Sequence, residues 1–171
     1  MDIVDCILAD HDRQRRWFAA LDEARDDLES AGKIFNRLRD HLEAHAMAEE
    51  KYFYPTLLQL GKGALDSDSA DETTEDAIDD HNKIANAADA ALNEKVGSDA
   101  WWECVDKANY QNSAHLSEEE RQGLTDFRRR VPLEKRIALG IKYLAFEADH
   151  VTNVEREEKD PDAYIEENEA A

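Results

Sequence analysis

Residues 41–55 read HLEAHAMAEEKYFYP, and this stretch decides the fold. Residues four apart lie on the same face of an α-helix, so His45 and Glu49 direct an imidazole and a carboxylate the same way. The same His-x-x-x-Glu pattern returns at His115 and Glu119. One such pair carries little information in a chain rich in glutamate, but its repetition indicates a shared role.

The two pairs belong to a longer repeat of histidines and glutamates. His81 follows His11 by 70 positions, and the same offset separates the two His-x-x-x-Glu pairs. A glutamate on an apolar helix face favours a bound cation, because an unpaired buried carboxylate is unfavourable. We therefore predict six metal ligands: His11, His45, Glu49, His81, His115 and Glu119. We expect their neighbours to be ordinary solvent-facing residues: Glu50, Glu118 and Glu120.

Breaks in the sequence assign the four histidines to four helices. Residues at one height on neighbouring antiparallel helices lie about equally far from the turn between them. The midpoints between successive histidines fall at 28, 63 and 98, beside breaks at 30–32, 61–63 and 96–98. The sequence therefore predicts an all-α fold, an up-and-down antiparallel four-helix bundle with the ligands at one level.

Capping and breaking residues predict where the helices begin and end. The first helix should begin after an N-cap at Asp2 and end near Ser30, and the second should follow Gly32. Pro55 should kink the second helix, because proline removes an internal hydrogen bond. Thr73 should cap the third helix, after a polar loop.

The C-terminal part adds one more helix to the bundle. We predict a four-helix bundle over 1–131, an extra helix over 132–155 and an acidic tail over 156–171. Pro132 suits the first turn of the extra helix. This helix is apolar on a broad face, so it should pack on the outside of the bundle or form a homodimer contact.

Composition excludes several classes of partner. The formal net charge of −20 argues against binding to nucleic acid or to an anionic membrane surface. No apolar run approaches the length of a membrane span. Cys6 and Cys104 form no disulfide framework, and the acidic N-terminus is unlike a signal peptide, so we expect a cytoplasmic protein.

The predicted ligand set indicates the metal. Imidazole and carboxylate ligands suit Fe, Mn or Zn, and the set contains no thiolate. Six ligands exceed the four of a structural zinc site. They divide naturally between two metals, each taking histidines from two helices, with the carboxylates bridging.

Four segments, LADHDRQRRWF, HAMAEEKYFYP, DDHNKIANAADAAL and HLSEEERQ, resemble the hemerythrin-like (HHE cation-binding) family. The resemblance covers about residues 3–130. It implies a non-haem di-iron centre of two Fe ions, held by the six predicted ligands and bridged by both glutamates with an oxo, hydroxo or water group. Oxygen-carrying members use a fifth histidine where this chain has Ala85. That difference argues against reversible oxygen carriage and leaves more of the coordination open.

The leading functional hypothesis is a di-iron protein that binds, senses or reacts with a small molecule such as O2, NO or peroxide. As an enzyme it would be a di-iron oxidoreductase. Two alternatives stay open: an iron-donating protein that repairs iron–sulfur centres, and a structural interaction bundle with zinc or no metal. His41 and His150 are further candidate ligands, although outer positions suit them better. Tyr52 should mainly fill the core.

Overall fold

The structure is a computed structural model, and it describes residues 1–64 and 69–150. The described residues form helices and no strands, so the predicted all-α fold is confirmed. The helices are α1 (Ile3–Glu23), α2 (Leu28–Tyr52), α3 (Tyr54–Leu60), α4 (Ala70–Ala91), α5 (Asp99–Arg121), α6 (Gly123–Arg130) and α7 (Leu133–Asp149).

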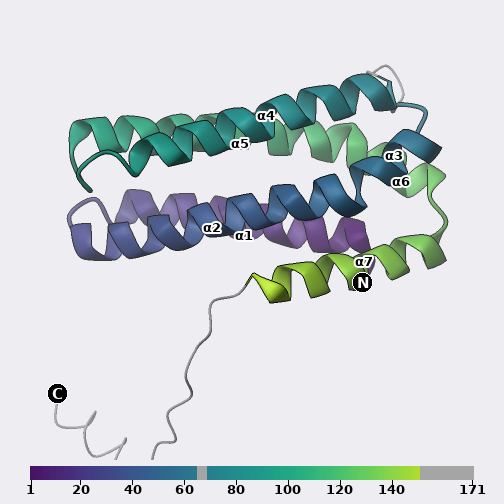
Figure 1. The fold of residues 1–171 in the computed structure, drawn as a ribbon, viewed down its shortest axis with the longest axis horizontal. Helices are drawn as coiled ribbons and strands as arrows, with labels where there is room; N and C mark the ends of the chain where they lie inside the picture. The colour runs from purple at the N-terminus through teal and green to yellow at the C-terminus, as the bar shows by residue number, and fades with distance from the viewer. Residues whose placement is uncertain (65–68, 151–171) are drawn as a thin grey trace, which may run out of the picture.

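The helices build an antiparallel four-helix bundle with one helix added outside. Figure 1 shows α1 and α2 as one pair and α4 and α5 as the other. Contacts of α2 with α4 and of α1 with α5 close the bundle. The short helices α3 and α6 extend α2 and α5 at one end, and α7 lies along α1 and α2. The predicted bundle with an additional C-terminal helix is therefore confirmed.

The turn between α1 and α2 lies earlier than predicted. Asp2 caps α1 as expected, in a capping box with Asp5. The helix ends at Glu23, and the side chain of Asp27 accepts the backbone N–H of Ser30 and begins α2. The predicted break at 30–32 is wrong, because this cap begins a helix that runs through Gly32.

Local chemistry also explains the limits of α3, α4 and α7. Pro55 lies in the first turn of α3, where its missing N–H is tolerated. The helix is interrupted at Phe53, between α2 and α3. Ser69 caps α4 in a capping box with Glu72, so the prediction of Thr73 as the cap is wrong. Pro132 is the N-cap of α7 and lies just before its first turn.

The turn between α4 and α5 falls where the sequence predicts it. Gly97 has a φ of 81°, in the left-handed region that favours glycine. Ser98 then caps α5 by accepting the backbone N–H of Trp101. Before Gly123 the fourth bundle helix is interrupted, which separates α5 from α6.

Two apolar clusters fill the two ends of the bundle. One includes Phe53, Leu57 and Phe127 beside α7, and the other includes Leu38 and Trp101 near the far turns. A buried polar layer lies between them, and it contains the predicted ligands. The apolar ends therefore stabilise the bundle while its middle layer is left for polar chemistry.

The helix α7 packs on α1 and α2, and its buried residues are Gly140 and Tyr143. Gly140 allows α7 to approach the start of α1 closely, because a Cβ at this position would lie 2.9 Å from the backbone nitrogen of Ile3. Tyr143 is fully buried, whereas Ile141 on the outer face is 66% exposed. The division of the chain at 131 and the homodimer through α7 stay predictions. The predicted tail, 156–171, and the last residues of the extra helix lie outside the described residues.

Candidate metal centre

The six predicted ligands converge in the middle of the bundle from all four of its helices. They are all buried, with exposed fractions of 7% or less. The helix α1 supplies His11, α2 supplies His45 and Glu49, α4 supplies His81, and α5 supplies His115 and Glu119.

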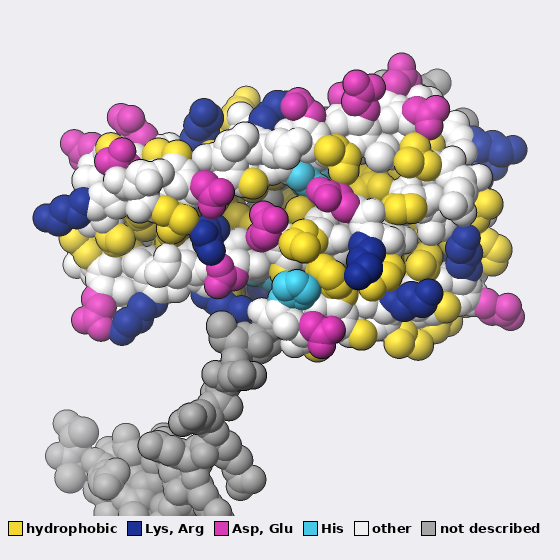
Figure 2. Space-filling model, in the orientation of Figure 1, with side chains coloured by type: hydrophobic (Ala, Val, Ile, Leu, Met, Phe, Trp, Pro, Cys, Tyr) yellow, Lys and Arg dark blue, Asp and Glu magenta, His cyan; other side chains and the backbone are white. Residues whose placement is uncertain are grey.

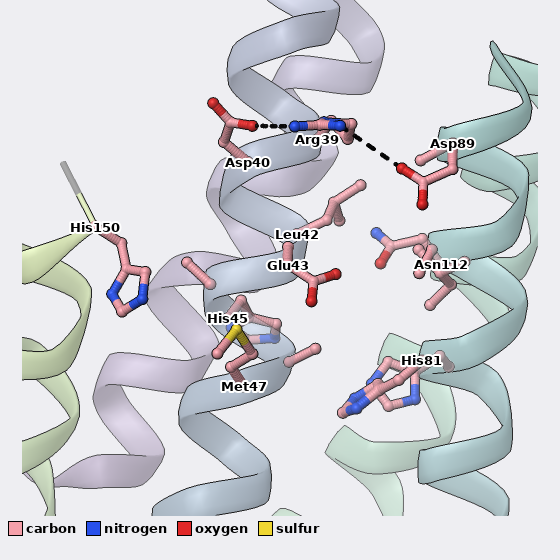
Figure 3. A pocket seen from close by; sticks show the side chains of 16 residues that line it. Arg39, Asp40, Leu42, Glu43, His45, Met47, His81, Asp89, Asn112 and His150 are labelled. Atoms are coloured by element: carbon pink, nitrogen blue, oxygen red, sulfur yellow. Dashed lines mark hydrogen bonds and ion pairs between the residues drawn. The ribbon is translucent and has the colours of Figure 1, made fainter. Parts of the chain in front are cut away.

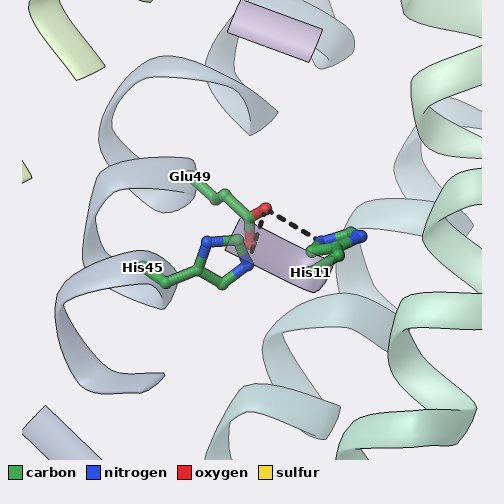
Figure 4. A group of neighbouring side chains, drawn as sticks. All are labelled: His11, His45 and Glu49. Atoms are coloured by element: carbon green, nitrogen blue, oxygen red, sulfur yellow. Dashed lines mark ion pairs between the residues drawn. The ribbon is translucent and has the colours of Figure 1, made fainter. Parts of the chain in front are cut away.

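Three of these residues form a first group between α1 and α2. The ligand atoms of His11, His45 and Glu49 lie within 4.8 Å of one another. Figure 4 shows both imidazoles directed at the carboxylate. Glu49 Oε1 lies 3.2 Å from Nε2 of His45 and 3.9 Å from Nε2 of His11. The i, i+4 spacing on α2 produces the shorter of these contacts.

The same glutamate also belongs to a second group with α4 and α5. Glu49, His81 and His115 have ligand atoms within 4.8 Å of one another. Glu49 Oε2 lies 3.4 Å from Nε2 of His81, which lies 3.3 Å from Nε2 of His115. The two groups of potential ligand atoms are thus adjacent and share one carboxylate.

Glu119 reaches the first group from the opposite side. Its Oε2 lies 3.2 Å from Nε2 of His11. The buried hydroxyl of Tyr54 donates a hydrogen bond of 2.5 Å to its Oε1. Glu119 therefore crosses from α5 to α1, as Glu49 crosses from α2 to α4.

Several inward-facing atoms of this centre have no hydrogen-bond partner within the described part of the chain. They are Nε2 of His11, Nε2 of His45, both oxygens of Glu49 and Oε2 of Glu119. Buried polar atoms are normally satisfied, and nitrogen and carboxylate oxygen are ligands for first-row transition metals. The residues therefore fit a pair of divalent cations.

The electrostatics of the metal-free layer support the same interpretation. Burial would lower the pKa of His11, but the neighbouring carboxylates of Glu119, Glu120 and Glu49 raise it to about 11. Burial would raise the pKa of Glu49, but the neighbouring histidines hold it well below its usual value. Without metal, protons must balance the buried carboxylates, and bound cations would replace these protons.

Two glutamates orient the histidines from outside. Nδ1 of His11 lies 2.9 Å from Oε1 of Glu120, and Nδ1 of His81 lies 2.9 Å from Oε1 of Glu50. Both are partly exposed as expected, with 42% of the Glu50 side chain and 31% of the Glu120 side chain accessible, but each also contacts the outer ring nitrogen of a histidine. The sequence contained a signal, since Glu120 follows Glu50 by the same 70 positions.

The two further histidines lie outside both groups. His41 forms a separate cluster with Asp10 and Glu147, and its Nε2 lies 3.8 Å from Asp10 Oδ1. The guanidinium of Arg13 already supplies a positive charge to this cluster, 3.1 Å from the same oxygen. His150 lies at the end of α7 and donates a hydrogen bond of 2.7 Å to the carbonyl of Phe146.

A cavity of about 430 Å³ leads from the surface to the centre between α2 and α4. Its walls include His45, His81, His115 and Ala85. Arg39 spans the far end by pairing with Asp40 and Asp89, as Figure 3 shows. In Figure 2, histidine atoms are visible in the hollow between the two helix pairs. The cavity is large enough for small molecules to reach the buried imidazoles.

These features define a cation-binding four-helix bundle. The model of the hemerythrin HHE cation binding domain matches residues 2–126, and the protein therefore belongs to this family. The fold is similar to that of a hemerythrin HHE cation binding domain-containing protein from Mycobacterium kansasii, with a TM-score of 0.74 and 17% identity. That match covers 88% of this chain and 87% of the other. Among curated proteins, no relative matches the chain.

Proposed function

We propose that the protein binds two iron ions and uses them to bind, sense or react with a small molecule such as O2, NO or peroxide. One observation carries the proposal: Glu49 is shared by two groups of buried ligand atoms. Two ferrous ions, when bound, would supply electrons and open positions for such a molecule. Mn or Zn could occupy the same donors.

Each residue of the proposed centre has a distinct role. His11 and His45 would hold one cation, and His81 and His115 the other, with Glu49 between them. Glu119 would complete the centre from α5, oriented by its hydrogen bond from Tyr54. Residues on rigid, packed helices hold such a geometry better than residues on loops.

The cavity supports a role in small-molecule chemistry over a purely structural one. It leads to the second group of ligands, past the small side chain of Ala85. A histidine at this position would enter the same wall and could close part of the cavity. The alanine keeps a path open to His81 and His115, as a reactive centre requires.

Spectroscopy of reconstituted protein tests this proposal. The protein is loaded with Fe(II) under anaerobic conditions and then exposed to air or to NO. We expect new absorption bands in the near-ultraviolet and visible range, which zinc-loaded protein lacks. The double variant His45→Ala, His115→Ala should lose both the iron and the bands. Iron-loaded protein without new bands, or a double variant that keeps its iron, would contradict the proposal.

The net charge of the protein and the length of its apolar helices bear on where it is located and what it binds. The described residues include no helix that could cross a membrane. With a net charge of −20, we propose a cytoplasmic protein whose partner is the small molecule and not nucleic acid. Cell fractionation tests the proposed location, and elemental analysis of protein purified from iron-replete cells tests the proposed metal.

A further inference from the structure

Tyr143 on α7 contacts the centre although it lies outside the four bundle helices. Its side chain is fully buried. The hydroxyl oxygen lies 2.7 Å from Nδ1 of His45 and 2.9 Å from Oδ2 of Asp10. One phenol thus joins a histidine of α2 to a carboxylate of α1.

The direction of these two hydrogen bonds follows from their chemistry. Asp10 is a carboxylate, held by Arg13 at 3.1 Å, and a carboxylate only accepts. Tyr143 has a single hydroxyl proton, so it must donate this proton to Asp10. Its oxygen then accepts from His45, whose Nδ1 must carry hydrogen. In the neutral imidazole that a metal requires, the lone pair of His45 is consequently on Nε2, the atom that lies 3.2 Å from Glu49.

The two halves of the centre are unequal in this respect. In the first group, Glu120 contacts Nδ1 of His11, and Tyr143 contacts Nδ1 of His45. In the second, Glu50 contacts Nδ1 of His81.

The 70-residue repeat gives Asp10 a counterpart in Asp80, but Asp80 pairs with Lys83 at 2.8 Å.

The position of α7 explains the difference. This helix contacts α1 and α2, and so it covers only the half of the bundle that contains the first group. On the other half, His115 borders the cavity between α2 and α4. Outer contacts that fix a ligating imidazole typically change metal affinity by about 10–100-fold.

We propose that Tyr143 is a positioning residue that fixes the tautomer of His45 and makes the His11–His45 position the tighter of the two metal positions. This inference rests on the dinuclear centre proposed above. It gives α7 a role in the metal site itself. The first cation to bind would occupy the half that α7 covers, and the second would occupy the His81–His115 half.

Titration of metal-free protein with Co(II) tests the proposal. We expect wild type to bind the metal in two steps, and Tyr143→Phe to weaken the tighter step about 10–100-fold while the weaker step is unchanged. Tyr52→Phe is the matched control, because Tyr52 packs on Phe146 of α7. It should leave both steps intact. Two unaltered steps in Tyr143→Phe would overturn the proposal.

The proton on His45 gives a second readout that a purely structural role would not change. In Zn(II)-loaded wild type, NMR correlations between ring protons and nitrogens should identify His45 as the Nδ1–H tautomer. This measurement needs no variant, so it tests the predicted tautomer of His45 even if Tyr143→Phe fails to fold. An Nε2–H tautomer would overturn the proposal. Wild type that binds fewer than two ions would instead contradict the dinuclear centre.

Discussion

Glu49 Oε2 on α2 lies 3.4 Å from His81 Nε2 on α4, so one carboxylate extends from one helix pair of the bundle to the other. Its second oxygen lies 3.2 Å from His45 on its own helix. Because the residue is fully buried, its charge must be balanced within the layer. This contact makes the two proposed cation positions interdependent.

Glu49→Ala should therefore remove both metal ions, because it deletes the ligand that the positions share. His115→Ala should remove mainly the ion of the α4–α5 group. Glu43→Gln is the control, since Glu43 is exposed on the same helix. Elemental analysis after anaerobic loading with Fe(II) measures each effect. A Glu49→Ala protein with full metal content would show that the assignment of Glu49 is wrong.

Access to the centre should depend on the size of residue 85. Ala85→Leu would project into the cavity between α2 and α4 and narrow the path to His81. We expect the iron content to stay the same and NO binding to slow severalfold in stopped-flow absorption. Ala90→Leu, at an exposed position on the same helix, should behave as wild type. Equal rates in all three proteins would exclude this path.

Gly140→Ala should destabilise the protein, although alanine normally favours a helix over glycine. The new Cβ would lie 2.9 Å from the backbone nitrogen of Ile3 and 3.0 Å from the carbonyl carbon of Asp2, and backbone cannot move aside easily. We expect a loss of about 1–3 kcal/mol in the free energy of unfolding. Urea denaturation measures it.

Gly32→Ala provides the matched control for this experiment. Its Cβ would meet only the side chain of Val96, at 3.5 Å, which is ordinary contact. We expect no loss of stability and a gain of up to about 1 kcal/mol from helix propensity. Similar destabilisation by both substitutions would show that the close approach of α7 to the N-terminus is not the cause.

The stability of the metal-free protein should fall as the pH rises through the range set by Glu147. Burial, and then the charge of Asp10, raises the pKa of Glu147 from 4.5 to about 8. The folded state thus favours the protonated form, and this contribution is lost between pH 4.5 and about 8.

Glu147→Gln should remove this dependence, because glutamine stays neutral. The free energy of unfolding of Glu147→Gln should equal that of wild type near pH 4.5 and exceed it most above pH 8. Chemical denaturation at several pH values compares the two proteins. Parallel pH profiles would show that Glu147 does not titrate in this range. Glu134→Gln, at an exposed position on α7, controls for the loss of one surface charge.

Much of the architecture was predictable from patterns within single helices. The 70-residue repeat predicted four helices with His11, His45, His81 and His115 near one level, and the structure brings these side chains together. The first turn was mislocated because residues 30–32 were interpreted as a break, whereas the helix runs through them. The capping side chain of Asp27 determines where α2 begins.

The sequence by itself determined the bundle and the candidate ligands, because helical periodicity and capping act between residues close in the chain. Only the tertiary structure decided which carboxylate both groups share, that Glu50 and Glu120 turn onto histidines, and that Tyr143 reaches His45. Those contacts join segments 31 to 109 positions apart. They depend on how the helices pack, and local patterns in the chain do not encode packing.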